Sequence, residues 1–191
     1  MSETGLYFVS NIVCNLFDDV IVKLQKSSLG CKVSGLCVNA IMYADDIILL
    51  AISITDLQKM VELCLNAFHE LDMRINVKKS MCMRIGSKFN SAVRNIIAEG
   101  IEIEWKSELK YLGVSLVAGK SLKCNLQVIK QKYFRALNGI FAKIGTRSDP
   151  MLTLSLFKSF CLPLLSYSLE AFKLNKSSYN TLESAHVAAF F

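Results

Sequence analysis

Two adjacent carboxylates, Asp45 and Asp46, interrupt the most apolar stretch of the chain and constrain its fold more than any other feature. They lie between the apolar blocks 40–43 and 47–51. Short apolar runs on either side of a polar turn are typical of buried strands, so the pattern predicts a hairpin with the carboxylates at its tip. The two charges repel each other and resist burial, so we expect them at a solvated turn or beside cations.

A plain turn explains part of this pattern, because aspartate is common in turns. The residues around the pair are bulky and apolar, however, whereas a tight hairpin normally uses Gly, Asn or Pro. Carboxylates on a rigid strand tip suit Mg²⁺, which takes oxygen ligands and is often shared with substrate phosphates. Two such ions can stabilise the attacking and leaving oxygens of a phosphoryl transfer. The pair therefore predicts either a solvated turn or a magnesium site.

The apolar periodicity of the chain changes near residue 119. Before this point helical and strand patterns are mixed, and after it the pattern is helical almost throughout, with Pro163 expected to kink or interrupt one helix. Thr55 and Gln58 have the spacing of a capping box. We therefore predict an α+β domain over 1–119 and an all-helical region over 120–191. The expected helices cover 16–24, 55–71, 89–98, 122–144, 150–167 and 179–191, and the expected strands cover 31–38, 40–51, 81–85, 101–104 and 109–116.

Charge divides the chain at the same place. Residues 1–119 carry twelve basic and thirteen acidic side chains, whereas residues 120–191 carry ten and three. A basic surface of this kind favours a polyanionic partner, and a merely solvated helical face would give the same count.

Cysteine and histidine usage argues against a zinc site and against disulfides. The seven cysteines form no C-x-x-C pair, and the chain has two histidines. Several cysteines lie in apolar runs, so we expect reduced thiols and an intracellular location. No secretory leader is indicated, and the apolar segment 36–54 is broken by Asn39 and the carboxylate pair, so no membrane partner is expected.

Three motifs together carry a resemblance to a known family. Tyr43-Ala44-Asp45-Asp46, with the apolar run after it, resembles the catalytic hairpin of reverse transcriptases. The segment 75–80 resembles the next motif of that family, and 110–114 resembles its primer grip. The Gly-Cys-Lys-Val-Ser-Gly-Leu segment at 30–36 is similar to the non-LTR, LINE-type variant. The resemblance implies a partial polymerase palm followed by a helical thumb and connection.

The resemblance also implies a role for each matching residue of the hairpin. Asp45 would ligate catalytic Mg²⁺, with Mn²⁺ as an alternative ion, and Asp46 would be the second carboxylate. Tyr43 and Ala44 would shape the turn against the primer terminus. Lys79 would lie near the phosphates of the incoming nucleotide, and the motif context favours this role over a solvated loop lysine.

Further residues would contact nucleic acid if the resemblance holds. Tyr111, Leu112 and Gly113 would position the primer 3′ end, with Gly113 allowing close backbone approach or serving as a plain bulge. Lys130 and Arg135, in the basic region, are candidates for primer binding. The implied partners are an RNA template, a DNA primer and deoxynucleoside triphosphates.

The chain departs from the family pattern upstream of the hairpin. Only 44 residues precede Asp45, and we find no further palm aspartate or fingers region in them. Asp18 and Asp19 resemble a helix between two family motifs, and 5–10 is at most a remnant of the Gly-Gln-Gly-type segment. We therefore expect the C-terminal part of a LINE-type reverse transcriptase, inactive unless a companion chain supplies the rest. The alternatives are a non-catalytic nucleic-acid-binding or structural remnant and, with less support, another phosphoryl-transfer domain such as a nucleotide cyclase.

Overall fold

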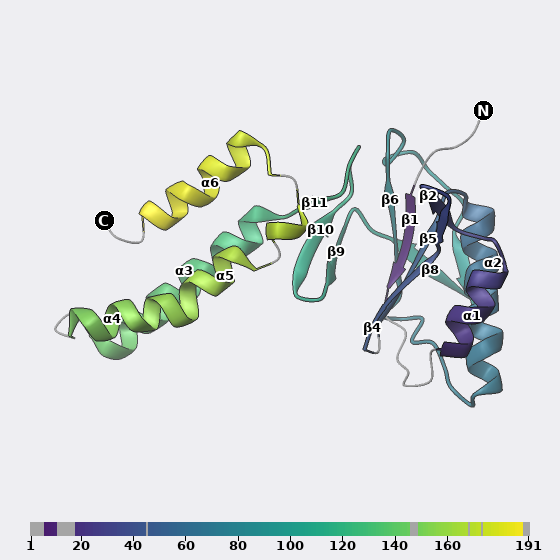
Figure 1. Ribbon diagram of the computed structural model, residues 1–191, viewed down its shortest axis with the longest axis horizontal. Helices are drawn as coiled ribbons and strands as arrows, with labels where there is room; N and C mark the ends of the chain where they lie inside the picture. The colour runs from purple at the N-terminus through teal and green to yellow at the C-terminus, as the bar shows by residue number, and fades with distance from the viewer. Residues whose placement is uncertain are drawn as a thin grey trace. The chain divides into compact units, whose positions relative to one another are not determined.

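The computed structural model describes residues 6–10, 18–44, 46–145, 149–167, 169–172 and 174–188, and it divides into two compact units (Figure 1). Unit 1 consists of Met1–Tyr111 and Leu116–Lys123, and unit 2 consists of Leu112–Ser115 and Cys124–Phe191. The chain therefore passes between the units three times, at sites on either side of the expected boundary at residue 119.

A six-stranded sheet forms the centre of unit 1, and its order is β4-β5-β1-β6-β8-β7. All neighbouring strands are antiparallel except β6 and β8, which are parallel. Mixed helices and strands confirm the α+β class. The strands are β1 (Leu6–Ser10), β4 (Ala40–Tyr43), β5 (Asp46–Ala51), β6 (Met81–Ile85), β7 (Ile96–Ala98) and β8 (Ile101–Trp105).

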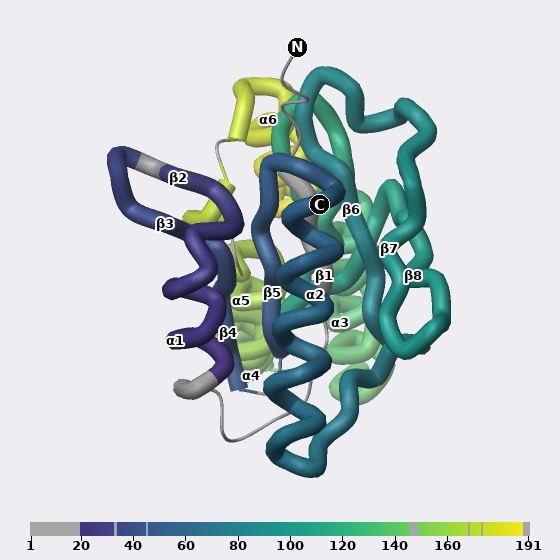
Figure 2. The backbone as a smooth tube through the Cα atoms, turned by 90° about the vertical axis from the view of Figure 1, so that its right-hand side faces the viewer, coloured from purple at the N-terminus to yellow at the C-terminus, as the bar shows by residue number. Residues whose placement is uncertain are grey.

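Two helices, α1 (Asp18–Lys26) and α2 (Ile54–Glu70), connect these strands and cover one face of the sheet (Figure 2). The order β1-α1-β4-β5-α2-β6, with β5 paired between β4 and β1, is the split β-α-β arrangement of ferredoxin-like folds. A small hairpin, β2 (Cys31–Val33) with β3 (Leu36–Val38), is inserted between α1 and β4.

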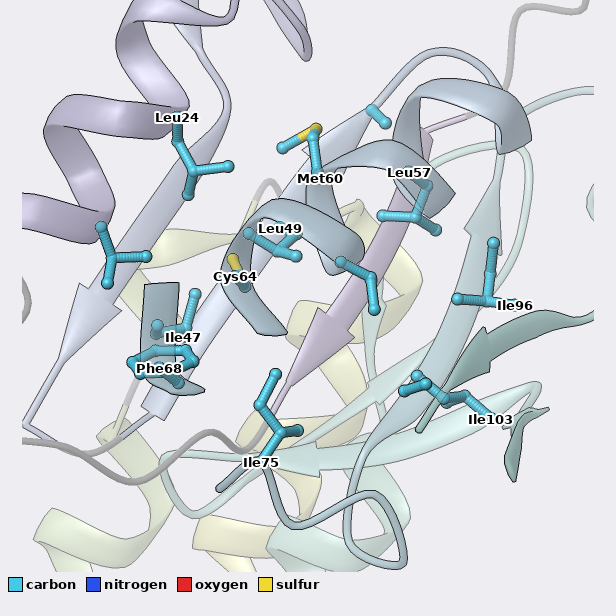
Figure 3. Close-up of a cluster of buried hydrophobic side chains, with 14 of the residues drawn as sticks. Leu24, Ile47, Leu49, Leu57, Met60, Cys64, Phe68, Ile75, Ile96 and Ile103 are labelled. Carbon is cyan, nitrogen blue, oxygen red and sulfur yellow. The ribbon is translucent and has the colours of Figure 1, made fainter. Parts of the chain in front are cut away.

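The core of unit 1 lies between α2 and the sheet (Figure 3). Leu57, Met60, Val61, Cys64 and Phe68 form a buried apolar stripe on α2, and this stripe packs against side chains of β5. Each such side chain contributes roughly 1.5–3 kcal/mol by leaving water. The central residues are Ile47, Leu49, Leu57, Met60, Cys64 and Phe68.

The N-terminus of α2 corrects the predicted capping box. Ser53, not Thr55, is the N-cap, and its hydroxyl accepts a hydrogen bond from the Asp56 N–H at 3.0 Å. Gln58 instead pairs with β7, where its side chain accepts from the Ile97 N–H and donates to the Ile97 carbonyl, both at 2.9 Å. The side chain of Gln58 thus pairs with backbone groups of the edge strand β7 instead of capping the N-terminus of α2.

The helix predicted over 89–98 is wrong. Turns closed by Phe89 N–H to Gly86 and Ser91 N–H to Lys88 occupy its first half, and the second half is strand β7. The β-branched residues at 96 and 97 fit a strand better than a helix, and pairing with β8 buries Ile96 completely.

Unit 2 is built mainly of helices around a second core. The buried side chains of α3 face those of the α4–α5 segment and α6, and the rings of Tyr133 and Phe157 meet edge to face with centroids 6.2 Å apart. The helical elements are α3 (Leu126–Ile144), α4 (Pro150–Leu156), the π-helical η1 (Phe157–Cys161), α5 (Leu162–Ser166), the 3₁₀ turn η2 (Leu169–Ala171) and α6 (Lys176–Val187).

Region 120–191 is not wholly helical, which corrects the prediction. A short strand, β11 (Lys123–Cys124), precedes α3 and belongs to a three-stranded sheet of order β11-β10-β9. The other strands of this sheet are β9 (Glu108–Tyr111) and β10 (Val114–Val117). The Asn125 N–H, donating to the Ser115 carbonyl at 2.8 Å, continues this pairing to the start of α3.

Pro163 changes the hydrogen bonding of its helix, as expected of proline, without ending it. The proline has no N–H to donate, and the residue before it, Leu162, donates to the Phe157 carbonyl five residues back. This π-helical turn lets Phe157, Cys161 and Leu165 all face the core.

The run Pro150–Ala171 is long and apolar enough to cross a membrane by length and composition alone. One such run is weak evidence, because core helices of water-soluble proteins pass the same test. Phe157, Cys161 and Leu165 in this run are buried in the core of unit 2. The absence of a membrane partner stays a prediction.

Candidate active site

The hairpin β4–β5 ends in a two-residue turn. Tyr43 pairs directly with Asp46, which leaves Ala44 and Asp45 between the strands. Ala44 has a φ of 51°, in the left-handed region, where an L residue with a Cβ costs roughly 1–2 kcal/mol. A positive φ is what a tight hairpin turn of primed type requires. Asp45, the first carboxylate of the predicted metal site, lies outside the described residues.

The two faces of this hairpin have different surroundings. Ala40 and Met42 lie opposite Leu49 and Ile47, and all four belong to the core under α1 and α2. Because side chains alternate along a strand, Asp46 projects from the other face, together with its cross-strand partner Tyr43. The carboxylate therefore lies on the sheet face away from the helices.

The tip of the hairpin is open to solvent. The Tyr43 side chain is 63% exposed, Ile41 on the same face is 47% exposed, and Asp46 is half-buried. A carboxylate with this partial exposure can be reached by a substrate.

Tyr111 lies within electrostatic range of Asp46, although nothing in the sequence spacing indicates it. Its hydroxyl oxygen is buried at the end of β9. Burial raises the pKa of the Tyr111 phenol, and the charge of Asp46 raises it further. The phenol therefore stays protonated at physiological pH. The resemblance implied a contact of Tyr111 with the primer, and only the tertiary structure relates Tyr111 to the hairpin carboxylate.

Lys79 lies on an exposed turn whose backbone is held by Asn76. The Lys79 N–H donates to both the carbonyl and the side-chain oxygen of Asn76, at 3.0 and 3.2 Å. Ile75 and Val77 are buried in the core and anchor the turn. The ammonium group is thus carried by a rigid turn at the start of β6.

This turn is at the same end of the sheet as the carboxylate. Strand β1 pairs antiparallel with both β5 and β6, and Val9 is level with Leu49 on one side and Cys82 on the other. Asp46 lies three residues before Leu49, and Lys79 lies three residues before Cys82. Two strand spacings, about 10 Å, separate β5 from β6.

The predicted primer-grip segment forms a second tight turn, between β9 and β10. Leu112 and Gly113 have φ values of 45° and 81°, the signs of a primed hairpin turn. Both carbonyls of this turn accept hydrogen bonds within unit 2: Tyr167 Oη donates to Leu112 at 2.9 Å and Lys132 Nζ donates to Gly113 at 2.8 Å. Neither donor was among the sequence-predicted residues.

Lys130 and Arg135 do not lie together. Five residues apart on α3, they are separated by about 140° around the helix. Lys130 is half-buried next to the core-facing Ile129, whereas Arg135 is exposed on the outer side of the helix.

A metal centre made by three or more His, Cys, Asp or Glu side chains is absent from the part of the chain that the structure describes. Asp46 is the described carboxylate that fits a hard cation, since it supplies oxygen ligands at an accessible strand end. Its neighbour Asp45 is the second candidate ligand and is not described.

The family of the chain is shown by comparison with known proteins. Residues 7–116, more than half of the chain, match the family model of reverse transcriptases, described as RNA-dependent DNA polymerases. The chain belongs to the reverse transcriptase family. Enzymes of this class generally use divalent metal ions and bind a nucleic-acid template and primer.

Two relatives place it among sequences derived from mobile elements. An uncharacterised transposon-derived protein of Caenorhabditis elegans is 25% identical over 158 residues, covering 82% of this chain and 57% of the relative. The retrovirus-related Pol polyprotein from a type-2 retrotransposable element of Drosophila melanogaster is 26% identical over 127 residues, covering 61% of this chain and 12% of the relative. These matches confirm the resemblance to non-LTR retrotransposon reverse transcriptases. The chain spans less than two thirds of the length of either relative.

Proposed function

We propose that unit 1 is the part of a reverse transcriptase palm that carries the catalytic hairpin, and that unit 2 is its helical thumb. The observation that supports this most is the position of Tyr43 and Asp46 at an accessible hairpin tip, away from the helices that cover the sheet. Such a tip can receive a primer end and a nucleotide while the core behind it stays dry.

Asp45 and Asp46 would hold the divalent ion, Mg²⁺ or Mn²⁺, which when bound neutralises developing charge on the transferred phosphate. The charge of Asp46 helps to keep the Tyr111 phenol protonated, so Tyr111 would offer a neutral O–H donor near the site. Lys79, on its rigid turn at the same end of the sheet, adds a positive charge for the nucleotide phosphates.

The isolated chain is proposed to lack polymerase activity. The strand beside β5 is β1, and its sequence Leu-Tyr-Phe-Val-Ser contains no carboxylate. A two-ion site would need a carboxylate from a neighbouring strand as well, and β1 does not supply one, so a further segment or a companion chain would have to contribute it. An intracellular location is proposed with this role.

A primer-extension assay on the purified chain, with an RNA template and either Mg²⁺ or Mn²⁺, tests this proposal. We expect no incorporation of deoxynucleotides. Incorporation that disappears in Asp45→Asn would overturn the claim of inactivity and support an intact site.

A second candidate function is nucleic-acid binding without turnover. It is favoured by the ten basic and three acidic side chains of residues 120–191. We expect the chain to bind an RNA–DNA primer–template, with affinity that falls as salt rises. Arg135→Gln should flatten the salt slope by about one unit, whereas Arg94→Gln in unit 1 should leave it unchanged. Binding that does not depend on salt would exclude this mode.

A further inference from the structure

The Leu112–Gly113 turn has an unusual tertiary support. A two-residue hairpin turn normally leaves its carbonyls to solvent, yet here each carbonyl accepts from a different side chain of unit 2. Lys132 extends from α3, and Tyr167 follows the last turn of α5. The turn itself, Leu112–Ser115, belongs to the same unit as both donors.

The backbone of the turn needs such support. Leu112 is a bulky residue at a positive φ, a conformation that persists only where the surroundings impose it. Gly113 follows with a φ of 81°, and a Cβ built on it would lie 3.6 Å from Cε1 of Tyr167. The ring of Tyr167 therefore packs over the glycine while its hydroxyl holds the preceding carbonyl.

The position of Tyr167 depends on the helix before it. Leu165 is buried in the core, and the Tyr167 N–H donates to the Pro163 carbonyl at 2.9 Å. At Tyr167 the backbone leaves the helical region, with a ψ of 127°. The helix thus ends at the residue that reaches the turn.

The hydrogen bond that holds the Leu112 carbonyl also fixes a backbone donor on the same peptide unit. The peptide unit is planar and trans, so a fixed Leu112 carbonyl fixes the direction of the Gly113 N–H. Gly113 is exposed and has no side chain to hinder approach. Backbone N–H groups of this kind commonly contact nucleic-acid phosphates and set the register of the strand.

We propose that Tyr167 and Lys132 are positioning residues, which lock the Leu112–Gly113 turn so that the Gly113 N–H holds the primer backbone near its 3′ end. This inference rests on the proposed function. It assigns a role to two residues that act through the turn and need not touch the primer themselves.

Hydrogen exchange on the full chain tests the lock without nucleic acid. Tyr167→Phe removes one hydroxyl, and Lys132→Met removes one ammonium group. Each should make exchange in peptides covering 109–117 about five-fold faster, as expected from the loss of one hydrogen bond. The matched controls, Tyr179→Phe on α6 and Lys143→Met at the end of α3, should leave these peptides unchanged. Equal exchange in all four variants would overturn the lock.

Binding then tests the role at the primer. With the melting temperature unchanged, Tyr167→Phe should weaken binding to a primer–template with a recessed 3′ end about three- to ten-fold and leave binding to single-stranded RNA unchanged. Equal weakening for both ligands, or none, would overturn the primer role. If the wild-type chain binds no primer–template, the proposed function falls and the primer role with it, while the exchange result still decides whether the lock exists.

Discussion

At the scale of single residues, the tip of the β4–β5 hairpin contains a strained backbone conformation that the sequence only suggests. The lack of glycine and asparagine there is unusual for a tight turn, and the structure shows the consequence in the left-handed φ of Ala44. Residues kept in strained conformations cluster at functional sites, where a strict geometry is worth a loss of stability. The strain at Ala44 therefore agrees with the catalytic hairpin proposed here.

Ala44→Gly should raise the free energy of unfolding by about 0.5–1 kcal/mol, because glycine adopts a positive φ without steric cost. Urea denaturation followed by circular dichroism measures the change. The control is Ala142→Gly, on the exposed side of α3, which should lower stability by about 1 kcal/mol. Destabilisation of similar size in both variants would show that Ala44 is not strained.

At the scale of elements, α2 shows which boundary a local pattern can identify. The helix expected over 55–71 forms as α2 (Ile54–Glu70), because its apolar residues repeat at helical spacing over several turns. The cap was not predicted correctly, because Ser53 and Thr55 both have side chains suited to capping and lie two residues apart. Packing of Leu57 into the core, together with the pairing of Gln58 with β7, selects Ser53.

Ser53→Ala should therefore lower the free energy of unfolding by about 1 kcal/mol, since the Asp56 N–H loses its acceptor. Thr55→Ala should change it by less than about 0.5 kcal/mol, because Thr55 is exposed and alanine is the better helix former. Thermal unfolding of the two variants compares them directly. A larger loss for Thr55→Ala would restore the capping box.

At the scale of the whole molecule, the reactivity of the cysteine thiols measures how well the cores of both units exclude solvent. Burial raises the pKa of the Cys64 and Cys82 thiols to about 12, so both stay protonated at neutral pH. Cys161 is also buried, in unit 2, whereas Cys37 is exposed. Only the thiolate reacts with alkylating reagents.

Iodoacetamide at pH 8 should modify Cys37 within minutes and leave Cys64, Cys82 and Cys161 unmodified until the chain is unfolded, as peptide mass spectrometry would show. Because the pKa of Cys64 and Cys82 is raised in the folded state, their contribution to stability is complete below about pH 9 and declines as pH rises towards 12. Early modification of Cys161 alone would indicate that the core of unit 2 opens independently of unit 1.

The sequence by itself determined the features that depend on neighbouring residues. The apolar blocks around Asp45 and Asp46 predicted the hairpin, the helical pattern over 55–71 predicted α2, and the Tyr-Ala-Asp-Asp motif identified the family. Each of these is a local repeat or a contiguous motif, which can be recognised before any tertiary contact is known.

The tertiary structure alone decided which distant residues meet. It placed Tyr111 within electrostatic range of Asp46, and it brought Lys132 and Tyr167 to the carbonyls of the Leu112–Gly113 turn. It also replaced the expected helix over 89–98 with an edge strand, because pairing with β8 outweighed a weak local preference. These features depend on how strands pair and helices pack, and that choice is made by the free energy of burying the whole core.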